Sequence, residues 1–343
     1  MLADLARFSP GYFGMAMATG IVSIAAHLLS MPGVARALFL LNIAIYGMLW
    51  ILTALRMILH PRCFLADLTD HLRGPGFFTA VAGSSVLGIQ FAILADNYRA
   101  ATALWVVAVA LWIMLTYTIF TAFTIKQHKP SLEAGISGSW LLAVVATQSV
   151  AALSALLAVH VGQPYRLQLN FFALSMWLWG GMLYIWMISL IFYRYNFFRL
   201  APGDLTPPYW INMGAMAIST LSGSLLIINA QDAPFLLSLL PFLKGFTVFY
   251  WATGTWWIPM LIVLALWRYV CQRFPLRYDP LYWGAVFPLG MYAAGTREMS
   301  AAIGLDFLSF VPPAFLYIAL VAWAVAFAGF AVSLLRRLTI ARV

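Results

Sequence analysis

One short pattern recurs five times along this chain, at intervals of roughly 60 to 75 residues. In each copy, a loop marked by proline or glycine leads into aromatic residues and then into a long apolar segment. A second apolar segment follows before the next copy begins, so each repeating unit is predicted to be a hairpin of two helices. The five copies therefore predict ten helices. The copies of the pattern are Pro10-Gly11-Tyr12-Phe13, Pro75-Gly76-Phe77-Phe78, Gly138-Ser139-Trp140, Pro207-Pro208-Tyr209-Trp210 and Pro280-Leu281-Tyr282-Trp283.

The apolar segments are long enough to cross a lipid bilayer. A helix needs about 20 apolar residues for this, and its backbone groups must pair internally because the hydrocarbon core holds no water. Hydrophobic residues make up 64% of the chain and charged residues only 8%, against about 25% charged residues in soluble domains. We therefore predict an all-α integral membrane protein, with one transmembrane domain over 1–343 and no soluble domain. The predicted spans are 9–30, 35–59, 76–95, 101–125, 137–158, 168–194, 208–229, 243–271, 280–302 and 310–335.

The basic residues predict how the chain is oriented. With ten spans both termini lie on one side, and fourteen of the 19 Lys and Arg residues fall on that side. Because cytoplasmic loops carry the excess of Lys and Arg, we expect a multi-pass protein of the inner (plasma) membrane with both termini cytoplasmic. Cys63 and Cys271 then share the reducing side, where a structural disulfide is not expected.

The chain lacks the residue patterns of an enzyme or a metal site. All ten carboxylates fall in loops or near predicted helix ends, so no carboxylate at mid-membrane depth can carry a proton or hold sodium. The five histidines are scattered without metal-ligand spacing, and no GxSxG or GxxxxGK[ST] motif is present. We therefore expect no catalysis, no metal, no cofactor and no nucleic-acid partner.

The first helix of each predicted hairpin is rich in small and hydroxyl-bearing residues, whereas the second helix is bulkier. Small residues also allow close helix packing, and this alternative stays open for each residue taken singly. As a set on five equivalent helices, they would supply hydrogen-bond donors to an anion in a narrow bore. We therefore predict a quasi-fivefold arrangement in which the odd-numbered helices line a central pore. The candidate pore-lining residues are Thr19, Gly20, Ser84, Ser85, Thr147, Gln148, Asn212, Ser219 and Gly290.

The ninth predicted span carries two further candidates. Pro288 lies about two turns into the span, where it bends a helix and can push the side chain of Phe287 toward the axis of the bundle. Arg297 and Glu298 lie toward the outer end. They are either an interfacial ion pair that anchors the helix end or an outer vestibule, in which Arg297 draws anions in and Glu298 tempers that attraction.

Four stretches carry a resemblance to a known family: Phe8–Phe13 leading to Met17–Ile21, Ser139–Leu142, Leu205–Ile211 and Phe287–Met291. In order and position they resemble the tellurite-resistance/dicarboxylate transporter family of the voltage-dependent anion channel superfamily, which includes fungal malate permeases and sulfite efflux proteins and the plant slow anion channels. The resemblance covers essentially the whole chain. It implies a homotrimer, five helical hairpins around a pore in each protomer, and Phe287 as the residue that occludes the pore.

One stretch departs from the family pattern. The fifth span of the family often begins with Asn-Pro-Ser-Trp, whereas this chain has Ser137-Gly138-Ser139-Trp140. A looser or displaced bend is expected there, and with it any departure from fivefold regularity.

Three functional hypotheses follow. The leading one is a channel or facilitator that moves small inorganic or organic anions through lipid-embedded protomers, with Phe287 and Pro288 at the gate. The alternative is a secondary transporter that exports C4-dicarboxylates, sulfite or tellurite-related anions, with or without linkage to protons; the lack of a midplane carboxylate counts against strict proton coupling. The third is a membrane-embedded enzyme or a scaffold, for which the segment 60–76 is the candidate docking element.

Overall fold

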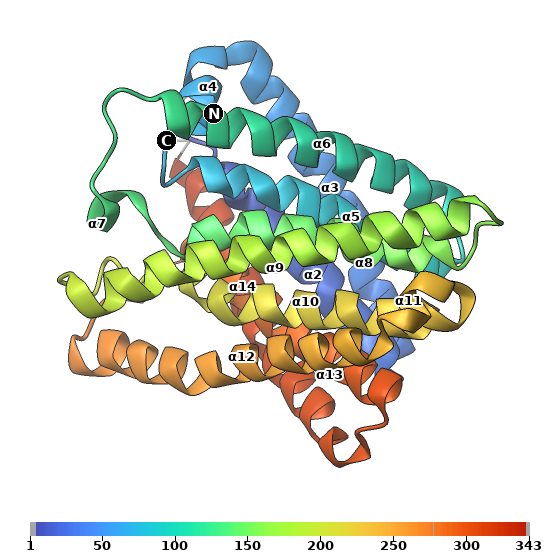
Figure 1. The fold of residues 1–343 in the computed structure, drawn as a ribbon. Coiled ribbons are helices and arrows are strands. Elements are labelled where there is room, and N and C mark those ends of the chain that lie inside the picture. The colour runs from blue at the N-terminus through green and yellow to red at the C-terminus, as the bar shows by residue number, and fades with distance from the viewer. Residues whose placement is uncertain (1–4, 277, 341–343) are drawn as a thin grey trace.

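The computed structural model describes residues 5–276 and 278–340 and contains helices but no strand within those ranges. Three short helices, α4 (Pro61–Leu68), α7 (Leu132–Gly135) and α11 (Pro234–Ser238), lie in the connections. The other ten α-helices are long, and Figure 1 shows them packed into one bundle. These are α2 (Phe13–Leu28), α3 (Pro32–Leu59), α5 (Phe78–Ala95), α6 (Tyr98–Ile125), α8 (Leu142–Ala158), α9 (Tyr165–Phe197), α10 (Ile211–Ile228), α12 (Leu240–Leu266), α13 (Trp283–Ile303) and α14 (Val311–Ile340).

Within the described residues, nine of these helices are long and apolar enough to cross a membrane. The sequence predicts ten spans, and α13, which corresponds to the predicted span 280–302, is the one outside the nine. It forms a continuous helix of 21 residues, as expected. Its sequence is less apolar because it contains three glycines together with Arg297 and Glu298.

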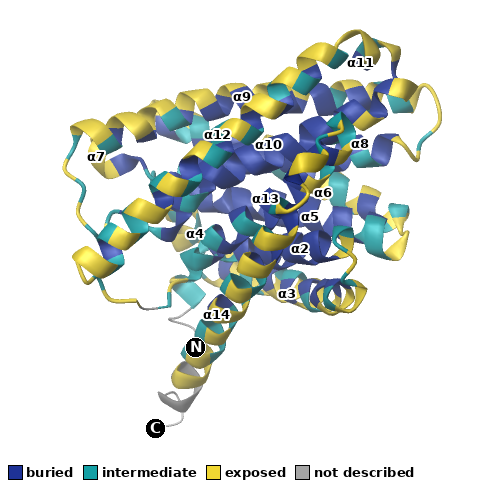
Figure 2. Cartoon of the chain, turned by 90° about the horizontal axis from the view of Figure 1, so that it is seen from below, coloured by how far each residue is buried: buried dark blue, intermediate teal, exposed yellow. Residues whose placement is uncertain are grey.

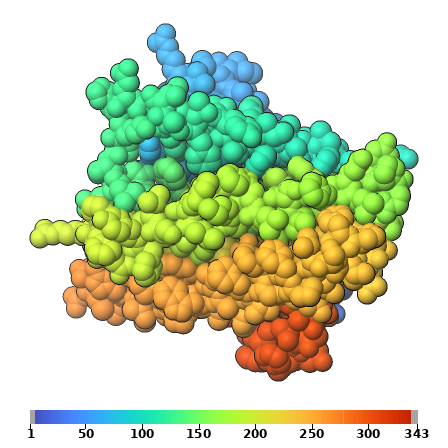
Figure 3. Space-filling model, viewed as in Figure 1, coloured from blue at the N-terminus to red at the C-terminus, as the bar shows by residue number. Residues whose placement is uncertain are grey.

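The long helices divide into a buried and an exposed set. Over an 18-residue stretch, 83% to 94% of the residues of the segments that contain α2, α5, α8 and α10 are buried, against 11% to 50% for those of α3, α6, α9, α12 and α14. α13 belongs with the buried set. We call α2, α5, α8, α10 and α13 the inner helices and the other five the outer helices. Figure 2 shows the buried set at the centre, and Figure 3 shows one face covered by α6, α9 and α12.

The contacts among the inner helices form a closed cycle. α2 packs on α5, α5 on α8, α8 on α10, α10 on α13, and α13 packs back on α2. Each inner helix also packs on the outer helix that follows it along the chain. The outer helices therefore separate the cycle from the surroundings.

Each inner helix starts with a 3₁₀ turn formed by the repeated sequence pattern: η1 (Pro10–Tyr12), η2 (Gly74–Phe77), η3 (Gly138–Leu141), η4 (Pro207–Trp210) and η7 (Pro280–Tyr282). Proline occupies the first or second position of four turns, where its fixed φ and missing N–H cost nothing. The fifth turn, η3, has Gly138 instead and is also a 3₁₀ turn. A Cβ at Gly138 would lie 2.5 Å from the carbonyl oxygen of Pro208 in η4, so glycine is needed for this close approach.

Candidate functional site

A cavity of about 560 Å³ lies where the starts of all five inner helices meet. Consecutive 3₁₀ turns contact one another in the order η1, η2, η3, η4 and η7, and η7 contacts η1 again, so the turns enclose this cavity as a ring. We call the cavity the N-terminal vestibule. Each turn contributes to its wall, through Gly11, Gly76, Ser139, Pro208 and Leu281.

The N-terminal vestibule has an electropositive construction. The aligned peptide dipoles give the start of a helix about half a positive charge, and five starts converge here. Arg7 and Arg73 also line the cavity, and Asp279 is the one acidic side chain among its described lining residues. The Asp279 carboxylate accepts a hydrogen bond of 2.8 Å from the backbone N–H of Leu281, so it caps its own helix. The balance of charge favours an anion in the cavity.

Phe287 lies on α13, which packs against α10 on one flank and against α2 on the other, and its side chain is fully buried. The next residue, Pro288, packs against α10, where a Cβ added to Gly214 would lie 2.6 Å from the Pro288 Cγ. On the other flank, Gly290 packs against α2, where an added Cβ would lie 3.2 Å from Ile21 Cγ2. The Phe287 side chain therefore leaves α13 between the directions of α10 and α2.

The opposite face of α13 is fixed by a hydrogen bond to an outer helix. The Trp251 indole of α12 donates to Thr296 Oγ1 at 2.9 Å. Thr296 follows Phe287 by nine residues, which is about 180° around an α-helix. Phe287 thus points away from α12, toward the interior of the inner cycle. It lies three residues, about 4.5 Å of helical rise, beyond Gly284 in the vestibule wall.

Three of the predicted pore-lining hydroxyls bond to outer helices. Thr19 accepts a hydrogen bond of 3.0 Å from a tryptophan of α14, and Thr147 accepts one of 2.8 Å from Trp112 of α6. Ser84 shares a hydrogen bond of 2.7 Å with Tyr46 of α3. Ser84 and Thr147 also donate to backbone carbonyls of their own helices. All three hydroxyls therefore join inner to outer helices, and those of Ser84 and Thr147 already donate their proton.

Two predicted glycines pack against neighbouring helices, as the close-packing alternative expects. A Cβ added to Gly20 would lie 2.5 Å from Val86 of α5 and 2.8 Å from Asn42 of α3, so that site has no room for a side chain. Gly290 packs on α2 as described above. Both glycines allow helices to approach closely.

The other predicted polar residues are buried, and their groups are only partly hydrogen-bonded. The amides of Gln148 and Asn212 donate to α9, to the Trp177 carbonyl at 2.9 Å and to a tyrosine hydroxyl at 3.3 Å. Ser219 donates to its own helix at 2.7 Å. Among the described residues, the Ser85 hydroxyl and the side-chain carbonyl oxygens of Gln148 and Asn212 have no hydrogen-bond partner.

Glu298, not Arg297, shares the face of Phe287. Glu298 follows Phe287 by eleven residues, about 20° from the same direction, whereas Arg297 is about 80° away. Arg297 is exposed and Glu298 is half-buried. If the interior of the cycle is open at the C-terminal end of α13, the Glu298 carboxylate lies at that opening, and Arg297 points in another direction.

Sequence reasoning missed the arginines of the N-terminal vestibule. It treated the basic residues of this side mainly as charges that orient the chain and, collectively, as a surface that favours anions, and it placed its one candidate anion-attracting residue at the opposite end. The available signal was position, because Arg7 lies three residues before η1 and Arg73 immediately before η2, two of the five repeated turns. Within the described residues, no group of three His, Cys, Asp or Glu side chains lies close enough together to hold a metal.

Comparison with known proteins gives one consistent result. The family described as voltage-dependent anion channel matches residues 7–331. An uncharacterized transporter of Methanocaldococcus jannaschii is 24% identical over 91% of this chain and 90% of its own length. A sulfite efflux pump of Arthroderma benhamiae is 26% identical over 94% of this chain and 90% of its own length. An uncharacterized membrane protein of Mycobacterium tuberculosis is 39% identical over 42% of this chain and 73% of its own length.

Proposed function

This chain belongs to the voltage-dependent anion channel family, and we propose that it is a channel or facilitator whose anions move through a bore inside the cycle of inner helices. The closed cycle, with five helix starts opening onto one cavity, is the observation that carries this proposal. In it the five hairpins have quasi-fivefold order, and each outer helix shields its inner partner from lipid. The chain acts as a transport protein and not as an enzyme.

Phe287 is the proposed occluding residue. Its ring is fully buried and points to the interior of the cycle, and the residue lies three residues beyond Gly284 in the vestibule wall. An anion that leaves the vestibule would meet an apolar ring at this level. Passage then requires the ring to swing aside, and Pro288 removes the backbone hydrogen bond that would hold the helix straight at that point.

Selectivity is proposed to come mainly from the helix starts. The unpaired oxygens of Gln148 and Asn212 are acceptors, which an anion avoids, and the hydroxyls that donate to carbonyls of their own helices are already engaged. Ser85 and Thr19, whose hydroxyl accepts but does not donate a hydrogen bond, are the remaining candidate hydroxyl donors from the predicted pore-lining set. Weak, distributed attraction of this kind lets an anion enter without being held too tightly to leave.

A transporter that exports sulfite, C4-dicarboxylates or tellurite-related anions is the second candidate. The similarity to proteins named sulfite efflux pumps, which covers almost the whole chain, favours it. Energy coupling distinguishes the two. A channel moves anions only downhill, whereas a coupled exporter moves them against their gradient when a proton gradient is imposed.

We also propose a homotrimer in the inner membrane, with both termini and the N-terminal vestibule on the cytoplasmic side. The excess of Lys and Arg on that side supports the orientation. The outer helices expose many large apolar side chains, as contact with lipid or with neighbouring protomers requires. The number of protomers rests on the family resemblance.

A flux assay on the purified protein in liposomes tests the proposed function. Efflux of chloride, nitrate, sulfite and malate is measured separately for the parent protein and for Phe287→Ala. We expect downhill movement of at least one anion, and faster movement through the variant. Folded protein that moves none of them in either form would refute the channel, and uphill movement driven by pH would replace it with the exporter.

A further inference from the structure

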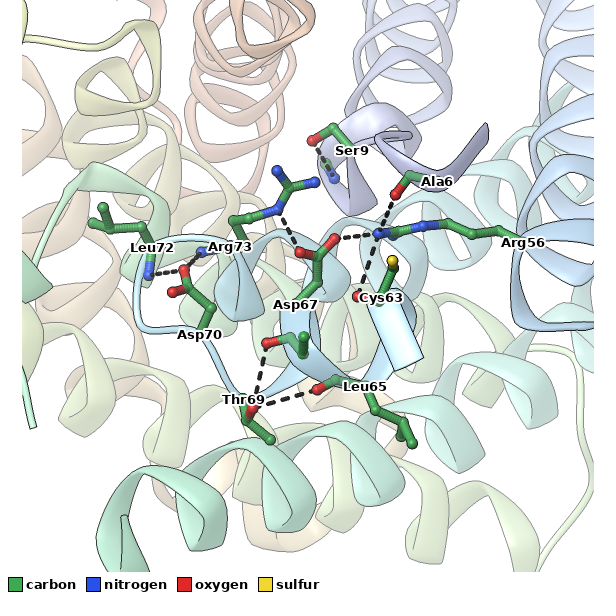
Figure 4. Close-up of polar contacts among 12 residues, drawn as sticks. Ala6, Ser9, Arg56, Cys63, Leu65, Asp67, Thr69, Asp70, Leu72 and Arg73 are labelled. Atoms are coloured by element: carbon green, nitrogen blue, oxygen red, sulfur yellow. Dashed lines mark hydrogen bonds and ion pairs between the residues drawn. The ribbon is translucent and has the colours of Figure 1, made fainter. Parts of the chain in front are cut away.

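Asp67 of α4 contacts two arginines at the edge of the N-terminal vestibule. Its Oδ2 pairs with Arg56 of α3, and its Oδ1 lies 2.7 Å from Arg73 Nε (Figure 4). Arg56 is 2% exposed and also donates to the backbone carbonyls of Ala6 and Cys63 at 3.2 and 3.5 Å. Three acceptors thus hold the guanidinium of Arg56 in place.

The burial of Arg56 decides which arginine keeps a net charge. A buried guanidinium is very costly without a counter-ion, so Arg56 requires the charge of Asp67. The three side chains together carry one net positive charge. That charge belongs to Arg73, which is 44% exposed and lines the vestibule. Without Arg56, Asp67 would simply neutralise Arg73.

Asp67 also sets the direction of Arg73. The bond to Asp67 uses Nε, and Figure 4 shows the two terminal Nη groups pointing away from Asp67 toward Ser9. Ser9 lines the same cavity, and its Oγ accepts a hydrogen bond of 3.3 Å from the backbone N–H of Gly11. The hydroxyl proton of Ser9 is then free to donate. Two Nη groups side by side match two oxygens of one oxyanion, which a single-atom halide cannot reproduce.

We propose that Arg73 and Ser9 form a capture site for small oxyanions at the mouth of the N-terminal vestibule, with Asp67 as the positioning residue. The inference rests on the proposed function in that the captured anion is the one that then passes Phe287. The site binds by a charged fork in a cavity where five helix starts already favour negative charge. It prefers an oxyanion such as sulfite or nitrate over chloride.

Binding to the purified full-length protein tests the site without requiring transport. Thermal unfolding is followed during titration with sodium sulfite, sodium nitrate or sodium chloride at constant ionic strength. We expect Arg73→Gln to weaken sulfite binding by about tenfold or more, the loss of a charge-assisted pair of hydrogen bonds. The matched control is Arg62→Gln, which removes the same charge from an exposed position of α4 outside the cavity wall. It should bind sulfite as the parent does.

A second variant separates the fork from the charge. Arg73→Lys keeps the positive charge but not the paired donors, so it should weaken sulfite and nitrate binding while chloride binding stays within about twofold. This variant also carries the test if Arg73→Gln does not fold. Equal sulfite binding by the parent and by every folded Arg73 variant would overturn the capture site.

The flux assay distinguishes failure of the site from failure of the proposed function. With sulfite supplied from the vestibule side, the concentration that gives half-maximal flux should be severalfold higher for Arg73→Gln than for the parent. The maximal flux should change little. If flux depends on Phe287 while Arg73→Gln alters neither binding nor half-saturation, the site is wrong and the channel stands. If sulfite binding depends on Arg73 and no anion moves, the channel is wrong and the site stands.

Discussion

Replacing Phe287 with alanine should open the proposed bore, and the size of the effect can be worked out from its burial. For an anion to pass, the fully buried ring must leave its packed position. Moving a phenylalanine side chain out of such packing costs about 1.5–3 kcal/mol. Since each 1.36 kcal/mol of barrier is tenfold in rate, Phe287→Ala should raise anion flux by about tenfold to a hundredfold.

The assay is anion efflux from liposomes, normalised to the amount of folded protein. Loss of a buried aromatic ring commonly costs about 3–5 kcal/mol of stability, so the folded fraction is measured for each variant. Phe78→Ala is the matched control. Phe78 is also an almost fully buried phenylalanine of an inner helix. Its ring, however, contacts an outer helix, because its centroid lies 6.1 Å from the ring centroid of Phe120 in α6. Its removal should destabilise the protein without raising flux.

Two results would refute this reasoning. Flux through folded Phe287→Ala that equals the parent's would show that the ring does not obstruct the path. An equal increase in Phe287→Ala and Phe78→Ala would show that the added flux is leakage through a loosened bundle and that the position of the ring is irrelevant.

Three further predictions concern other parts of the molecule. Glu298→Gln removes a negative charge from the face of α13 that carries Phe287 and should raise anion flux about twofold to fivefold by relieving repulsion; an unchanged rate in the liposome assay would place this carboxylate outside the path. Thr147→Val removes the acceptor of the Trp112 indole and should lower unfolding stability by about 0.6–1.7 kcal/mol with flux per folded protein unchanged; a selective loss of flux would instead return Thr147 to the bore. The exposed thiols of Cys63 and Cys271 should react with a membrane-impermeant maleimide only from the cytoplasmic side, whereas labelling in intact cells would reverse the proposed orientation.

The sequence was enough to predict the helices and to separate the inner set from the outer set. The predicted span 101–125 corresponds to α6 (Tyr98–Ile125), and 76–95 corresponds to η2 followed by α5, which ends at Ala95. The repeat made this possible, because a 3₁₀ turn marked by proline or, in η3, by glycine begins every second long helix. The same repeated turns surround the N-terminal vestibule, so the site was within reach of a sequence argument.

The directions of the inner side chains could not be predicted from the sequence. An inner helix such as α5 is buried on nearly every side, so no polar face distinguishes the bore from the outer helices. Ser84 and Ser85 are adjacent and chemically identical, yet one bonds to α3 and the other has no described partner. Likewise, Arg56 and Asp67 meet through a fold that brings α3 and α4 together, and their sequence spacing alone gives no sign of the buried charge.

The current carried by Phe287→Ala in a planar bilayer tests the central claim most directly. The two sides hold a tenfold gradient of the sodium salt of whichever anion moves fastest in liposomes. A bore selective for anions predicts a current that reverses within a few millivolts of the anion's equilibrium potential, about 59 mV in magnitude for a monovalent anion. A reversal potential of the opposite sign, or no current from folded variant protein, would contradict an anion path past Phe287.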